Sequence, residues 1–151
     1  MGSIQIKPMS ATIQIQLSPS AIALADKFRD APQQFPQAIK RGMTKALAIV
    51  SGRIQEQRLT GHGPFPVELH RLGERTGQLK LRTRATEAQI VSEGTQSVVQ
   101  GAIGSSVSYA AYQEFGTKRL PERAPFRTGI RENLSYISEM IEKEVVASLK
   151  P

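Results

Sequence analysis

Side chains that carry out catalysis or bind metal ions are few in this chain and are not spaced to act together. His62 and His70 lie in the Gly- and Pro-rich text GHGPFPVELHRLG and lack the spacing of a metal-ligand pair. Asp26 and Asp30 are one helical turn apart, and such carboxylates on an exposed helix are usually just solvated. The sequence contains 0 Cys, which excludes thiol nucleophiles and zinc-thiolate sites. We therefore expect no enzyme, no metal site and no cofactor.

The glycine-rich stretches do not form a nucleotide site. Residues 73–77 read GERTG, but a phosphate-binding loop needs a strand before it and a Lys-Ser/Thr pair after it. Residues 101–106 read GAIGSS, which indicates a turn and nothing more. We expect no small-molecule substrate.

The chain is strongly basic, with a formal net charge of +7 and a pI near 10.1, which favours a polyanionic or acidic partner. Residues 78–84 alternate and predict a strand whose outer face carries Lys80, Arg82 and Arg84. Such a face is most simply solvated, but it could also contact an acidic neighbour, the lumen of a ring or DNA. Because the strand has no aromatic residue and no recognition helix is evident, DNA would be bound without reading its sequence.

Further alternation predicts the rest of the sheet. Residues 12–17 place Ile13, Ile15 and Leu17 on one face, and residues 87–92 and 97–103 predict two more strands around the turn text Glu93-Gly94-Thr95. Together with residues 78–84, these segments predict an antiparallel sheet of about four strands. Residues 1–11 are expected to form an N-terminal arm, and residues 12–151 one domain.

The helices are marked by capping residues and apolar periodicity. Ser18 and Pro19 begin one helix, which Pro32 ends. A second helix begins near Phe35 or Pro36 and runs to Gly61, with a basic outer surface. A third covers residues 128–149 and is acidic, so the second and third could pair within or between subunits. The predicted fold class is α+β, with the sheet packed against two or three helices and a long C-terminal helix.

The chain carries no sign of a membrane segment. Its longest purely apolar run covers residues 46–50, far below the roughly 18 residues that a span needs. Residues 1–7 lack the apolar core of a signal peptide. We therefore expect a soluble protein without a membrane partner.

An aromatic turn followed by a proline-stiffened loop occupies residues 107–127. Tyr109, Tyr112 and Phe115 recur every three residues, which predicts a short helix with one aromatic stripe. Gly116 can end that helix, and the prolines at 121 and 125 prevent regular structure after it. The segment is either an ordinary connection between helices or a loop built to hold a shape.

The same segment resembles a known protein family. Tyr109-Ala110, Tyr112 and then Glu114-Phe115-Gly116-Thr117, followed by a Pro/Arg loop ending in Pro125-Phe126, are similar to the tail-completion or virion-morphogenesis family of lambda-like and Mu-like tailed phages. Arg75-Thr76-Gly77 with Leu79 resembles a Thr-Gly-x-Leu signal of that family. The loop has one residue more than the family's PARPF text, and Arg127-Thr128-Gly129-Ile130 lacks its usual Leu and Pro.

The resemblance implies a non-enzymatic virion protein that forms a ring, commonly sixfold, in the phage neck or at the head-proximal end of the tail. Its partners would be other copies of itself and the neighbouring neck and tail-tube proteins, with assembly in the host cytoplasm. The alternative function is a small, non-sequence-specific DNA-binding protein.

Three groups of residues follow from this hypothesis. The predicted subunit interface comprises Tyr109, Tyr112, Phe115, Gly116, Thr117, Lys118, Arg119, Pro121, Arg123, Pro125 and Phe126. The 61–73 loop, expected to reach an adjacent layer, contributes His62, Phe65, His70 and Arg71. The lumen or polyanion contact is the Lys80, Arg82 and Arg84 group. We expect Phe126 to anchor the interface, and Phe115 to support the fold.

Overall fold

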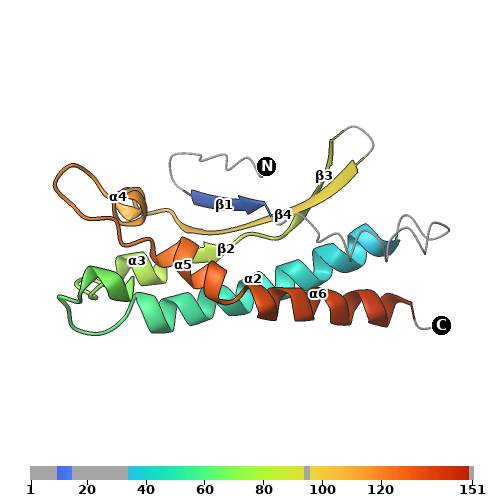
Figure 1. Ribbon diagram of the computed structural model, residues 1–151, viewed down its shortest axis with the longest axis horizontal. Helices are drawn as coiled ribbons and strands as arrows, with labels where there is room; N and C mark the ends of the chain where they lie inside the picture. The colour runs from blue at the N-terminus through green and yellow to red at the C-terminus, as the bar shows by residue number, and fades with distance from the viewer. Residues whose placement is uncertain (1–9, 15–33, 94–95, 150–151) are drawn as a thin grey trace.

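The computed structural model describes residues 10–14, 34–93 and 96–149. Residues 1–9 of the expected arm, the end of the first predicted strand and the helix expected between Ser18 and Pro32 lie outside the described residues. The rest forms an α+β fold with one antiparallel sheet (Figure 1).

The sheet is organised around its longest strand, β4 (Gln96–Ser105). Strand β1 (Ser10–Gln14) pairs with one edge of β4. Strands β2 (Thr83–Ala85) and β3 (Gln89–Glu93) follow one another along the opposite edge. Four strand segments therefore make a sheet that is three strands wide. Because β1 begins at Ser10, the boundary expected between residues 11 and 12 falls inside a strand.

The strand expected at residues 78–84 is wrong in its first half. Residues Gln78–Leu81 form a short helix, α3, and only Thr83–Ala85 extend as β2. Gly77 adopts a positive φ of 68°, which turns the chain into the helix at little steric cost. The Thr83 hydroxyl then donates to the Leu79 carbonyl at 2.7 Å and closes the turn.

Helix α2 (Gln34–Arg58) packs along the sheet and against the C-terminal helix. Its buried side is a continuous stripe: Phe35, Ala38, Ile39, Gly42, Met43, Ala46, Leu47, Val50, Ser51 and Ile54. The predicted apolar periodicity of this helix is confirmed. Figure 1 shows the strands as one layer, and α2 with the C-terminal helix as the other.

The C-terminal helix is divided into α5 (Pro125–Glu132) and α6 (Leu134–Ser148), not continuous over residues 128–149 as expected. Asn133 lies at the break with φ −105° and ψ 12°. Its side-chain amide donates to the Gly129 carbonyl at 2.8 Å, while its Oδ1 accepts from Arg53 at 2.6 Å. These contacts hold the bend against α2.

The expected pairing of a basic and an acidic helix is confirmed within one subunit. Lys45 and Arg41 on α2 both contact Glu144 on α6, the second at 3.6 Å. Near the other end of α2, Arg58 pairs with Glu132 on α5. The two helices therefore run antiparallel, and these charges are used inside the subunit rather than held for a neighbour.

Among the described helices, none combines the length and apolar character needed to cross a bilayer.

Candidate functional site

One end of the molecule gathers α3, helix α4 (Ala110–Phe115) and the loops at residues 61–77 and 116–124 (Figure 1). A cavity of about 800 Å³ opens between them. We call this part of the molecule the cavity end. It contains most of the residues that the sequence singled out, so we describe their positions here.

Helix α4 buries a different side from the one its aromatic residues suggest. Ala110 and Glu114, four residues apart, are its buried residues. Tyr109 and Tyr112 are exposed, with 39% and 55% of their surface accessible. Phe115 is half-buried, with the Arg127 guanidinium 4.9 Å from its ring centre. The two tyrosines are therefore available to a partner.

Glu114 on α4 is a buried carboxylate, 2% exposed. Its Oε2 accepts from the Phe126 backbone N–H at 3.0 Å, and its Oε1 accepts from the Arg127 backbone N–H at 2.9 Å. The Arg127 Nε donates to Oε1 at 3.0 Å and balances the charge. Glu114 thus satisfies the free N–H groups at the start of α5 and lies near its positive dipole end.

From the sequence, Glu114 was identified only as part of the Glu-Phe-Gly-Thr motif, without a structural role of its own. Its position four residues after Ala110 was a usable signal, because the two had to share a face of the short helix. Its partners at the start of α5 could not be foreseen, since they depend on how the loop returns.

The loop at residues 116–124 has a fixed shape and an exposed tip. Gly116 has a φ of 71°, and a Cβ there would lie 2.8 Å from the Glu122 nitrogen, so only glycine fits. The Thr117 N–H donates to the Leu120 carbonyl at 2.8 Å, and its hydroxyl accepts from the Leu120 N–H at 3.0 Å. The Arg123 N–H donates to the Gln113 carbonyl at 3.1 Å, which anchors the return of the loop.

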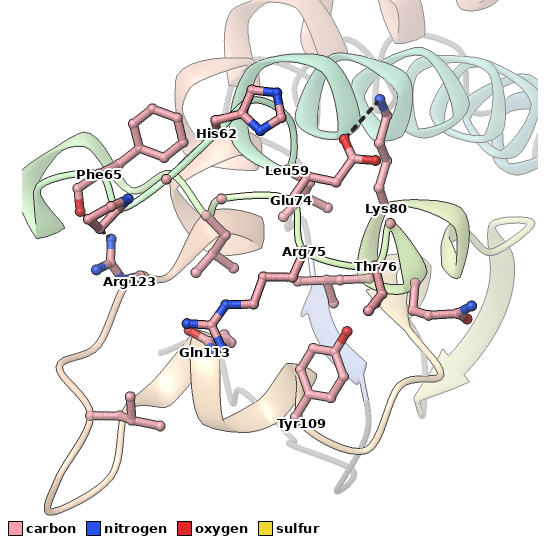
Figure 2. Close-up of a pocket in the computed structure, with 18 residues that line it drawn as sticks. Leu59, His62, Phe65, Glu74, Arg75, Thr76, Lys80, Tyr109, Gln113 and Arg123 are labelled. Atoms are coloured by element: carbon pink, nitrogen blue, oxygen red, sulfur yellow. Dashed lines mark hydrogen bonds and ion pairs between the residues drawn. The ribbon is translucent and has the colours of Figure 1, made fainter.

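Arg123 joins this loop to the 61–73 loop. Its Nη1 donates to the carbonyl oxygens of Phe65 and Arg71, at 2.8 and 3.1 Å. Figure 2 shows Arg123 beside Phe65. In return, His70 donates from Nδ1 to the Arg123 carbonyl at 2.7 Å. The two loops therefore form one unit, and Arg123 is not free to contact another subunit.

The 61–73 loop, which is expected to reach an adjacent layer, is held by contacts within its own subunit. Arg71 donates twice to the Thr60 carbonyl, at 3.0 and 2.8 Å, and its guanidinium lies 4.4 Å from the Phe65 ring centre. The side chains of Phe65, His70 and Arg71 are half-buried in these internal contacts, and their contact with an adjacent layer stays a prediction. His62 remains exposed beside the cavity.

Phe126 is not an exposed anchor. It is 2% exposed and belongs to the hydrophobic core, and Pro125 is also buried. Because α5 begins at Pro125, its first turn already packs inward toward α2. Phe126, which was predicted to contact another subunit, is therefore buried, whereas Phe115, which was predicted to support the fold, is only half-buried.

The basic residues expected on one strand face do not share one. Lys80 lies on α3 and contacts the Thr60 hydroxyl at 3.0 Å and the Glu74 carboxylate at 3.9 Å. Arg82 ends α3, whereas Arg84 lies on β2 and donates to nearby backbone carbonyls. The prediction of a basic strip is therefore wrong.

The cavity has an apolar floor and a polar rim. Its apolar lining includes Leu59, Leu72 and Leu79. On the rim, Figure 2 shows Arg75 extending across the opening toward Gln113, with the phenol of Tyr109 on the same side. These groups can bind an acidic or polar side chain of a partner. Within the described ranges, no group of three or more His, Asp or Glu residues is placed to hold a metal ion.

The carboxylates with shifted pKa values lie on other parts of the molecule. The hydrogen bond from Lys45 lowers the pKa of Glu144, and the hydrogen bond from Lys40 lowers that of Glu87. Both are pairs that support the packing of α2, not groups that face the cavity.

Comparison of the chain with protein-family models, with curated proteins and with solved structures gave no match.

Proposed function

We propose that this chain is a structural virion protein of a tailed phage or prophage. By its family resemblance it forms a sixfold ring at the head-proximal end of the tail or in the neck, and joins tail to head. It carries out no reaction and binds copies of itself and the neighbouring neck and tail-tube proteins. It assembles in the host cytoplasm and ends in the virion.

The observation that carries this proposal is the loop at residues 116–124, which is rigidly held and exposed at its tip. Lys118, Arg119 and Pro121 are exposed, and Leu120 has 45% of its surface accessible. A loop already fixed in shape loses little conformational entropy on binding, so its contacts contribute more fully to affinity. An ordinary helix connection needs neither the buried carboxylate nor the Arg123 contacts.

The two motifs behind the family resemblance meet at this loop. The Glu-Phe-Gly-Thr motif supplies the Glu114 carboxylate and the Gly116 turn, and the Pro-Phe pair supplies the N–H of Phe126 that the carboxylate binds. Residues ten or more positions apart thus cooperate to shape one loop. This gives a physical reason for the motifs to occur together and supports the resemblance.

Burial divides the proposed interface residues into two sets. Tyr109, Tyr112, Thr117, Lys118, Arg119, Leu120 and Pro121 are exposed and would contact a partner. Phe115, Gly116, Arg123, Pro125 and Phe126 build and hold the loop. Leu120 is an addition that the sequence alone had not suggested.

The alternative of a DNA-binding protein has no specific observation in its favour. It depended on a basic strip that the described residues do not form. A gel-shift titration at rising salt would revive it if affinity for DNA were high and fell steeply with salt.

Deletion of the gene in the encoding phage or prophage tests the proposal. We expect heads and tails to be made but not joined, and a wild-type copy supplied in trans to restore complete particles. Immunogold electron microscopy should place a tagged chain at the neck of those particles. Normal particles from the deletion strain, or a chain absent from purified virions, would overturn the proposal.

A further inference from the structure

The cavity end carries exposed positive charges without partners among the described residues. The side chains of Arg75, Lys118 and Arg119 are exposed, and within residues 34–93 and 96–149 none makes an ion pair or hydrogen bond. The neighbouring Arg123 and Arg127 differ, because their guanidinium groups are used internally. The three unpaired cations are therefore free to meet an acidic surface.

Large apolar side chains lie on the same end. Tyr112 is 55% exposed, and Tyr109 and Leu120 are also exposed. Tyrosine and arginine are enriched at protein interfaces, where aromatic area and charge act together. We call the following six residues the tip surface: Arg75, Tyr109, Tyr112, Lys118, Arg119 and Leu120.

Helix α6 presents a second surface of complementary character. Its exposed positions recur at spacings of four and three, so they share one side of the helix. We call this side the outer face: Ser135, Glu139, Glu142, Val146 and, directly after the helix, Leu149. Within the described ranges Glu139 and Glu142 have no ion pair, unlike Glu144. Lys143 is also exposed beside them and offsets part of their charge.

We infer that the tip surface of one copy binds the outer face of α6 in the next copy. This inference rests on the proposed ring function and names its subunit contact. Figure 1 shows α4 and its loop at one end of the molecule and the end of α6 toward the other. One copy can therefore use both surfaces at once, as a head-to-tail contact repeated around a ring requires.

Charge argues against the symmetric alternatives. Two tip surfaces facing each other would bring Arg75, Lys118 and Arg119 against the same cations. Two outer faces would oppose Glu139 and Glu142 against themselves. Juxtaposed like charges disfavour such partners strongly, whereas the head-to-tail pairing joins opposite charges. The exposed apolar groups would then be buried together, Tyr112 and Leu120 against Val146 and Leu149.

Disulfide cross-linking tests the contact directly, because the chain has 0 Cys and any introduced thiol is unique. Lys118→Cys is mixed with a tagged Glu142→Cys variant and oxidised, so that the mixed dimer has its own mass. We expect several-fold more mixed dimer than in the control mixture of Lys118→Cys with tagged Ser97→Cys, whose thiol lies on the exposed part of β4. Equal yields in the two mixtures would overturn the inference.

Charge reversal supplies an independent test. The Lys118→Glu/Arg119→Glu double variant and the Glu139→Lys/Glu142→Lys double variant should each self-associate about 10- to 100-fold more weakly, since each places like charges in contact. Mixed in equal amounts, they should recover association, because every contact is then between opposite charges. Lys143→Glu is the matched control and should not weaken association. A mixture no better than either variant alone would contradict the contact.

The inference and the proposed function fail in different ways. If the chain is found at the neck of particles but the cross-link does not form, the ring uses other surfaces and only this inference is wrong. If the cross-link forms but virions lack the chain, the contact stands and the virion function is wrong.

Discussion

The cavity end and the pair of helices α2 and α6 are held together by different physical means. Between the helices, aliphatic side chains such as Met43 and Ile137 are buried, and the ion pairs of Glu144 lie at the surface. At the cavity end, Glu114 and Arg123 bind backbone groups from segments far away in sequence. Apolar packing responds to changes in side-chain volume, whereas a buried charge depends on each of its polar partners. The cavity end should therefore respond more sharply to polar substitutions.

The two regions meet at Phe126, where the largest effect is expected. Phe126→Ala should lower the free energy of unfolding by about 3–5 kcal/mol, because it removes a buried ring and leaves a cavity in the core. Denaturant unfolding followed by circular dichroism measures this. Phe115→Ala is the control and should cost clearly less, since its ring is half-buried. Equal losses would mean that the core does not extend to the loop as described.

The next largest effect is expected at Glu114. Glu114→Ala should cost roughly 3 kcal/mol, because the N–H groups of Phe126 and Arg127 and the Arg127 guanidinium lose their partner. The loop should also loosen, so trypsin should cut faster after Lys118 and Arg119. Glu122→Ala removes the exposed partner of Arg127 and should leave both stability and cleavage nearly unchanged. A loop in Glu114→Ala that resists trypsin like wild type would refute this role.

Two glycines of α2 test the apolar region with the same substitution. Gly42→Ala should destabilise by about 1–3 kcal/mol, because its Cβ would lie 2.7 Å from the Ile141 Cα and force α2 and α6 apart. Gly52→Ala meets nothing within 4 Å and should stabilise the helix by about 0.5–1 kcal/mol. Thermal unfolding of the two variants should therefore shift in opposite directions. Shifts of the same sign would mean that the helices are not in close contact at Gly42.

The smallest effect is expected at the surface ion pairs. The hydrogen bond from Lys45 lowers the pKa of Glu144 from its ordinary value of 4.5, so the folded state favours the ionised carboxylate. This contribution to stability is present at neutral pH and is lost as the pH falls through the lowered pKa. Glu144→Gln should therefore be slightly less stable than wild type at pH 7 and equal to it in strong acid. Unfolding midpoints of the variant and of wild type across this pH range measure the effect. The difference between the two proteins at pH 7 should shrink in high salt, which screens exposed charges.

Periodic elements could be predicted from the sequence, whereas features set by distant contacts could not. The long apolar stripe of α2 and the alternation in β3 and β4 were sufficient to predict these three elements, because each pattern repeats along its segment. The alternation over residues 78–84 was misleading, since a turn at Gly77 and a hydroxyl bond from Thr83 favour a short helix. At the break, Asn133 accepts a hydrogen bond from Arg53, which lies 80 residues earlier and could not be paired with it from the sequence.

In the candidate site, too, some features could be predicted from the sequence and others depended on contacts between distant segments. Lys118 and Arg119, which the family resemblance placed at the interface, lie on an exposed tip. The inward position of Phe126 could not be predicted, because a ring in a loop motif can face either a partner or its own core. The contact of Arg123 with the 61–73 loop also required the fold, since no local pattern links the two segments.

The contacts of Arg123 determine which side chains the joining of the two loops requires. Its guanidinium binds carbonyl oxygens, which every residue at positions 65 and 71 would supply. These two hydrogen bonds therefore do not depend directly on the side chains at positions 65 and 71. The connection between the two loops is thus specified by one arginine on the 116–124 side and by backbone geometry on the 61–73 side.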